Sequence, residues 1–86
     1  MDNYETTRID LSVDKSDEVR AIMSEVLLAL REKGYNPISQ LVGYFLSSDP
    51  TYITNHRGAR GVIRRMERDE ILEVIIREYI DGIDLG

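Results

Sequence analysis

The sequence predicts an all-α protein, built as a compact bundle of four helices plus a short helical turn, with an extended N-terminal arm. Apolar residues recur at helical spacing through most of the chain. Gly34, Pro37 and Pro50 stand between these apolar stripes and Gly82 follows the last one, at positions where helices end or begin. The length of 86 residues suits one small domain. We therefore expect an arm over residues 1–13, one helical domain over 14–82 and a tail over 83–86.

The arm is predicted from a period of two. Ile9, Leu11 and Val13 alternate with polar residues, which is typical of an extended segment. Residues 1–8 show no pattern and are expected to be mobile. The arm would lie along the domain or pair with another chain.

Two helices are predicted in the first half of the domain. The first, over residues 15–33, has an apolar stripe, and Gly34 is placed to end it in a left-handed conformation. The second begins at Asn36-Pro37, where Asn36 can cap and Pro37 suits the first turn. Gly43 lowers its helix propensity by about 1 kcal/mol and is expected to allow close approach of another helix. The two stripes are Val19, Ile22, Met23, Val26, Leu27 and Leu30, then Ile38, Leu41, Val42, Phe45 and Leu46.

A short turn and two further helices complete the domain. Asp49-Pro50 starts the turn, which runs through Tyr52 and Ile53. The third helix is expected at roughly 56–66, capped by Thr54-Asn55 and weakened by Gly58 and Gly61. The charged run 67–70 marks a kink or break, and Gly82 ends the last helix. The apolar residues of these helices are Ala59, Val62, Ile63 and Met66, then Ile71, Leu72, Val74, Ile75, Ile76, Tyr79 and Ile80.

The last helix is apolar around more than half its circumference, which suggests burial on two sides. In so small a protein this favours a homodimer, either intertwined or side by side. The alternative is a monomer in which this helix is central.

Composition excludes several classes of protein. The chain has no cysteine, so no disulfide or thiolate metal ligand is expected. No apolar run approaches the length of about 20 residues that spans a membrane, and the acidic, polar start does not resemble a signal peptide. A cytoplasmic protein without membrane insertion is therefore expected. The net charge of −5 also argues against broad affinity for nucleic acid.

No pattern for catalysis or for a cofactor is present. His56 is the only histidine, so a zinc site would need three carboxylates beside it, and a surface or capping role is the simpler interpretation. Asp69, Glu70 and Glu73 are ordinary helix-surface carboxylates. We expect no enzymatic activity, no metal and no cofactor.

A basic cluster is the most informative chemical feature. Five of the 11 Lys and Arg residues lie between Arg57 and Arg68, namely Arg57, Arg60, Arg64, Arg65 and Arg68. On a helix the first three of these share one face. They form either a solvated face laced with weak ion pairs or a docking face for an acidic partner or a phosphate. Nucleic-acid binding through this helix is a weaker alternative.

The segment EKGYNPISQLVGYFLSSDPTYIT (32–54), followed by HRGAR and IRRMERDEI, resembles the IreB family of small regulators in Gram-positive bacteria. The resemblance covers about residues 6–80. It implies a non-enzymatic helical homodimer that is a substrate of a transmembrane Ser/Thr kinase with PASTA domains. It also implies control of peptidoglycan synthesis and cephalosporin resistance. In some members this control acts through Clp-protease turnover of the enolpyruvyl transferase that begins the pathway, so the implied partner is Clp machinery or a cell-wall enzyme.

The resemblance also assigns a modification site. Glu5-Thr6-Thr7-Arg8-Ile9 matches the family's N-terminal pattern, so Thr6 takes the place of the phosphorylated threonine. Thr7 stands where the family usually has an apolar residue, and either threonine is a candidate acceptor. Gly58 and Gly61 stand where the family commonly has Asp and a polar residue, which leaves the arginines with fewer acidic neighbours. Phosphorylation would either dock the arm on Arg57, Arg60 or Arg64 or repel it from an acidic partner.

Overall fold

Four α-helices and two short 3-10 helices form in the part of the chain described by the computed structural model, residues 2–47 and 49–85, with side chains from residue 15 onward. In chain order they are α1 (Asp2–Lys33), α2 (Pro37–Ser47), η1 (Pro50–Tyr52), η2 (His56–Gly58), α3 (Ala59–Ile63) and α4 (Arg68–Asp81). No strand occurs among these residues. The predicted all-α class with four helices and a short helical turn is thus confirmed.

Helix α1 is much longer than the sequence predicts. It begins at Asp2, so the prediction of an extended segment over residues 9–13 is wrong. No glycine or proline precedes Gly34, and a helix that is already nucleated gains a hydrogen bond with each added residue. Three alternating apolar residues were too short a signal to outweigh this. The mobility of residues 1–8 and the domain boundary near residue 14 remain predictions.

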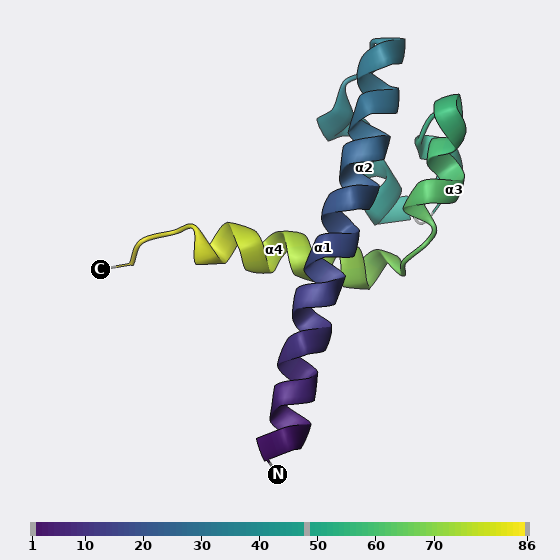
Figure 1. Cartoon of the computed structure of the whole chain (residues 1–86). Helices are drawn as coiled ribbons and strands as arrows, with labels where there is room; N and C mark the ends of the chain where they lie inside the picture. The colour runs from purple at the N-terminus through teal and green to yellow at the C-terminus, as the bar shows by residue number, and fades with distance from the viewer. Residues whose placement is uncertain (1, 48, 86) are drawn as a thin grey trace.

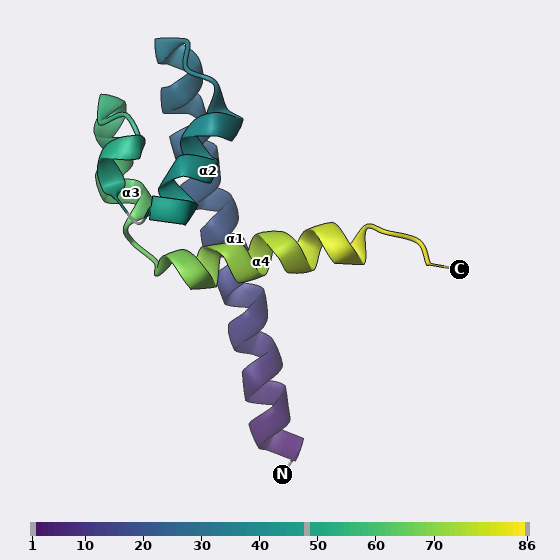
Figure 2. The same ribbon diagram turned by 180° about the vertical axis from the view of Figure 1, so that it is seen from behind.

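The helices are arranged around the C-terminal half of α1. Helices α2 and α3 and both 3-10 helices lie beside that half, while α4 crosses α1 near its middle (Figure 1, and from behind in Figure 2). The crossing is marked by Ser16 Oγ, which donates to a Glu78 carboxylate oxygen at 2.6 Å, and by Lys15 Nζ, 3.1 Å from Glu70.

Two helix ends project from this bundle. The N-terminal part of α1 and the C-terminal part of α4 leave the crossing in different directions (Figures 1 and 2). The radius of gyration is 14.7 Å, against about 12 Å expected for a compact domain of this length. The difference reflects these projecting ends.

The predicted ends of α1 and α2 are confirmed by their geometry. Gly34 has φ +76°, the left-handed conformation that glycine adopts without strain. The Asn36 side-chain oxygen accepts hydrogen bonds from the backbone N–H groups of Ile38 (2.9 Å) and Ser39 (3.1 Å), so Asn36 caps α2.

Asp49 does the same for the predicted turn, which forms as η1, by accepting from Thr51 N at 3.0 Å. The cap before η2 is Thr54, whose hydroxyl accepts from His56 N at 3.2 Å, while the Asn55 side chain makes no capping bond.

The third predicted helix is shorter than expected. Arg57 (φ +57°) and Gly58 (φ +72°) are left-handed, so only Ala59–Ile63 is α-helical after η2. The predicted break falls over residues 64–67. Helix α4 already starts at Arg68, after an extended Glu67 (ψ 146°).

The core lies where α1 meets the other elements. Its buried residues are Val19, Ile22, Val26, Ala29, Leu30, Tyr44, Ile53, Ala59, Val62, Ile63, Ile71 and Val74. The close approach expected at Gly43 is made by η1, because a Cβ placed on Gly43 would lie 2.5 Å from Tyr52 Cδ1. The remaining apolar residues of α2 are half-buried or exposed, since this short helix turns only one side to the core.

Candidate functional site

The five predicted site arginines come from four parts of the chain. Arg57 lies in η2, Arg60 in α3, Arg64 and Arg65 in the break after α3, and Arg68 at the start of α4. We call these five residues the arginine cluster. The prediction that Arg57, Arg60 and Arg64 share one helical face is wrong, because the left-handed conformation of Arg57 and Gly58 separates Arg57 from α3.

Two members of the cluster are bound to the protein's own backbone. Arg60 Nε donates to the Ile53 carbonyl at 2.8 Å, and Arg68 Nη1 donates to the Phe45 carbonyl at 2.9 Å. Both side chains are partly buried. Phe45 lies in the last turn of α2, whose carbonyls lack partners within the helix. Arg60 and Arg68 therefore hold loops and helix ends in place, through contacts across the fold that residue spacing does not indicate.

The other three arginines face solvent. Arg57 and Arg65 lie 3.5 Å from Glu32 and Glu25 of α1, and both pairs are exposed, so each contributes little to stability. Arg64 makes no ion pair or hydrogen bond with any described residue. The acidic residues that are nearby in sequence, between 67 and 73, form no ion pair with these three arginines in the described residues. The accessible part of the cluster is therefore Arg57, Arg64 and Arg65.

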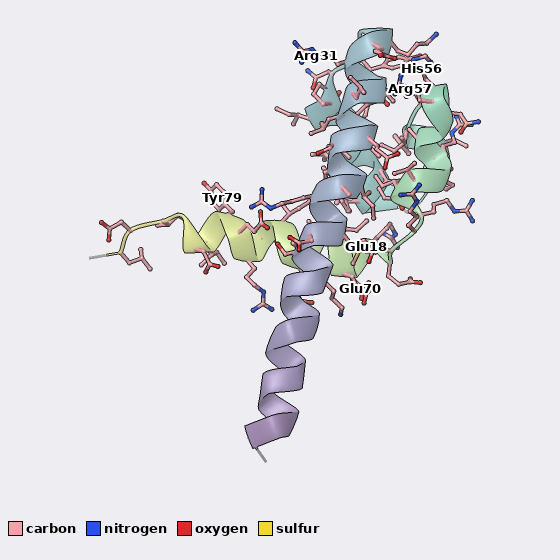
Figure 3. All side chains as sticks on the ribbon, in the orientation of Figure 1. Glu18, Arg31, His56, Arg57, Glu70 and Tyr79 are labelled. Carbon is pink, nitrogen blue, oxygen red and sulfur yellow. The ribbon has the colours of Figure 1, made fainter. Side chains whose placement is uncertain are left out.

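His56 belongs to the same surface. Its Nε2 lies 2.8 Å from Glu32 Oε1, and Figure 3 shows His56 and Arg57 beside the C-terminal end of α1. The His56 hydrogen bond and the nearby Arg57 charge lower the pKa of Glu32, so this carboxylate is ionised at neutral pH. Nowhere in the described residues do three or more potential metal ligands gather.

The outer side of α4 is a second exposed surface. Ile71 and Val74 are buried on its inner side, whereas Ile76, Ile80 and Tyr79 remain 48 %, 54 % and 73 % exposed. Tyr79 stands on the part of α4 beyond the crossing with α1 (Figure 3). A groove of about 530 Å³ runs along this side, lined by Asp69, Leu72, Glu73, Ile76, Arg77, Ile80 and Asp81. Two buried sides were expected for this helix. Within the described part of a single chain, only the inner side, with Ile71 and Val74, is buried.

The candidate phosphorylation sites, Thr6 and Thr7, lie near the start of α1, and their side chains fall outside the described ones. Arg65 pairs with Glu25 of the same helix, 19 residues after Thr6. At 1.5 Å per residue, Thr6 and Glu25 are about 28 Å apart along the axis. The structure therefore does not bring Thr6 or Thr7 together with the chain's own arginine cluster.

These features define a small helical protein whose distinctive chemistry lies on two surfaces, one rich in arginine and one apolar. Among the described residues no helix has the length and apolar character needed to cross a membrane.

Comparison with known proteins places the chain in a family. Residues 4–81 match the family model described as "IreB regulatory phosphoprotein". A UPF0297 protein of Acetivibrio thermocellus is 54 % identical over 81 residues, covering 94 % of this chain and 90 % of the relative. A UPF0297 protein of Ruminiclostridium cellulolyticum is 51 % identical over 78 residues, covering 91 % and 89 %. The chain belongs to the IreB family, which confirms the resemblance noted in its sequence and supports a regulatory, non-enzymatic role.

Proposed function

We propose that the protein is a substrate of a PASTA-type Ser/Thr kinase and that it controls peptidoglycan synthesis and cephalosporin resistance through protein–protein contacts. Membership in a family of regulatory phosphoproteins carries the proposal. Thr6 or Thr7 near the start of α1 is the acceptor, because Glu5-Thr6-Thr7-Arg8-Ile9 follows the family pattern. The partner is Clp-protease machinery or a cell-wall enzyme, and phosphorylation relieves the regulator's effect.

The partner docks on the accessible part of the arginine cluster. Arg57, Arg64 and Arg65 lie close together in sequence and are exposed, and none of them donates to a backbone carbonyl among the described residues. Guanidinium groups suit carboxylates and phosphates on a partner surface. Arg60 and Arg68 stabilise the neighbouring backbone through their hydrogen bonds to the carbonyls of Ile53 and Phe45.

The working form is a homodimer built on the outer side of α4. Leu72, Ile76, Tyr79 and Ile80 form an exposed apolar stripe on one helix. Exposed apolar surface of this kind is usually covered by a partner. The groove also carries both charge signs, with Arg77 beside Glu73, as a two-fold contact between identical surfaces allows.

The acceptor is tested by incubating the full chain with the cognate kinase and ATP and mapping the phosphate by mass spectrometry. We expect phosphate on Thr6, on Thr7 or on both. Thr6→Ala and Thr7→Ala variants separate these outcomes, and Ser12→Ala, in the same N-terminal part of the chain, serves as the matched control. Phosphate confined to residues after Lys15, or no phosphate at all, contradicts the assignment.

A further inference from the structure

A polar concavity lies where α2, the break after α3 and the start of α4 meet. Its volume is about 240 Å³, and it is lined by Tyr44, Arg64, Met66, Glu67 and Arg68. It is separate from the apolar groove on α4. It shares Arg64 with the docking surface proposed above, but Tyr44, Met66 and Glu67 lie outside that surface.

Tyr44 points to a ligand in this concavity. The residue is only 3 % exposed, yet its hydroxyl makes no hydrogen bond with any described residue. Burial raises the pKa of Tyr44, while the nearby charges of Arg68 and Arg64 act in the opposite direction. Tyr44 lines the same concavity as Arg64 and Arg68, and its raised pKa keeps the hydroxyl protonated at neutral pH. The hydroxyl is not among the fully buried atoms that lack a partner, so it still reaches the concavity that Tyr44 lines, and an acceptor bound there can take its proton in a hydrogen bond.

Two of the other residues that line the concavity, Arg64 and Arg68, are also donors. Arg64 has no partner among the described residues. Arg68 donates from Nη1 to the Phe45 carbonyl, and its other N–H groups make no hydrogen bond with a described residue. Helix α4 starts at Arg68, and its N-cap residue Glu67 supplies no side-chain capping bond. The Asp69 carboxylate accepts from Glu70 N at 3.0 Å, so the N–H groups of Arg68 and Asp69 and the positive end of the helix dipole are what the start of α4 offers to a ligand.

We propose that this concavity binds a phosphate monoester. Donors from α2, from the break after α3 and from the start of α4 line this one concavity. A tetrahedral dianion with three terminal oxygens can use all of them, whereas a planar carboxylate matches only a forked pair. Glu67 is the one acidic lining residue, and its charge opposes binding.

The phosphate comes either from a phosphorylated side chain or from a free phosphate compound. The first source rests on the function proposed above, with phosphorylated Thr6 as the side chain. A helical α1 holds Thr6 about 28 Å along its axis from Glu25 and so keeps it away from the chain's own arginines. The phosphorylated side chain would therefore bind in the concavity of a second copy. The site itself does not depend on that assignment.

The test titrates the full chain at constant ionic strength with three probes while amide chemical shifts are recorded. The probes are inorganic phosphate, a peptide of residues 1–12 carrying phosphothreonine at position 6, and the same peptide without phosphate. We expect saturable shifts at Tyr44, Arg64 and Arg68 with a phosphorylated probe. Arg64→Gln should weaken binding about tenfold and Tyr44→Phe several-fold, as expected for lost bonds to a charged group.

Arg65→Gln is the matched control, since it removes a neighbouring exposed charge that does not line the concavity, and we expect less than about a twofold change. Glu67→Gln should tighten binding. Phosphopeptide affinity well above that of phosphate assigns the source to the N-terminal segment, and equal affinity assigns it to free phosphate; both uphold the site. No saturable binding of either, or equal losses in Arg64→Gln and Arg65→Gln, overturns it. Kinase mapping of Thr6 and Thr7 is independent of either result.

Discussion

At the scale of single residues, Gly43 and Gly61 differ although both lie within α-helices, Gly43 in α2 and Gly61 in α3. A Cβ on Gly43 would collide with the Tyr52 ring, whereas nothing lies within 4 Å of a Cβ on Gly61. We expect Gly43→Ala to lower the free energy of unfolding by about 1–3 kcal/mol through overpacking. Gly61→Ala should raise it by up to about 1 kcal/mol, because alanine is the better helix former. Urea denaturation of the two variants checks this, and equal effects would contradict the close approach of α2 and η1.

Arg68 and Arg65 provide a second contrast, between a structural and a solvated arginine. Arg68→Gln removes the bond to the Phe45 carbonyl, and we expect the free energy of unfolding to fall by about 1–2 kcal/mol. Arg65→Gln removes only an exposed pair with Glu25 and should change it by less than about 0.5 kcal/mol. Thermal and urea unfolding of both variants measure the difference. A larger loss for Arg65 would show that the cluster is held by ion pairs.

Asp49 gives the fold a dependence on acid pH. Hydrogen bonds from the Thr51 backbone and hydroxyl lower the pKa of Asp49 in the folded chain. A carboxyl with a lowered folded pKa stabilises the fold above its ordinary pKa, and the contribution is lost as pH falls through the lowered value. We expect Asp49→Asn to lower the free energy of unfolding by a constant amount near neutral pH. Just below the ordinary carboxyl pKa, the stability of this variant should fall less steeply with falling pH than that of the wild type. An unchanged acid limb of the stability curve would remove Asp49 as its source.

At the scale of elements, local sequence signals predicted most of the helix ends. They failed where contacts between distant residues, or the propagation of a helix that has already formed, determine the structure. Gly34, Asn36-Pro37 and Asp49-Pro50 act within a few residues, so their roles were predictable from spacing. The extended segment over residues 9–13 was predicted from alternation alone, and continuous helix from Asp2 outweighed it.

The candidate site was less predictable than the fold. The sequence shows five arginines close together along the chain, and their role as a docking site stays a prediction. It did not show that Arg60 and Arg68 bind carbonyls, because Ile53 and Phe45 become neighbours only through the fold. Tyr44 was missed as well. Its place three residues after Leu41 marks it as a core residue of α2, and nothing in that spacing indicates that it lines a concavity with Arg64 and Arg68.

At the scale of the whole molecule, we expect the exposed apolar side of α4 to form the contact between two copies of the chain. We expect the wild-type chain to sediment at twice the mass of one chain at micromolar concentration. Ile76→Glu places a charge in the middle of the apolar stripe and should give a monomer with its helix content retained. Arg31→Glu, an exposed change at the far end of α1, is the control and should leave the dimer intact. A dimer that survives Ile76→Glu would place the contact elsewhere.

Growth of the source bacterium on a cephalosporin most directly tests the central claim, that phosphorylation near the start of α1 relieves the regulator's effect on the cell wall. In a strain with a chromosomal Thr6→Ala, Thr7→Ala double variant, phosphorylation cannot relieve the regulator's effect. We therefore expect the cephalosporin resistance of this strain to fall below that of the wild type. Deletion of the gene should move resistance in the opposite direction. Equal resistance of the double variant and the wild type, with both proteins present at the same level, would contradict the proposed switch.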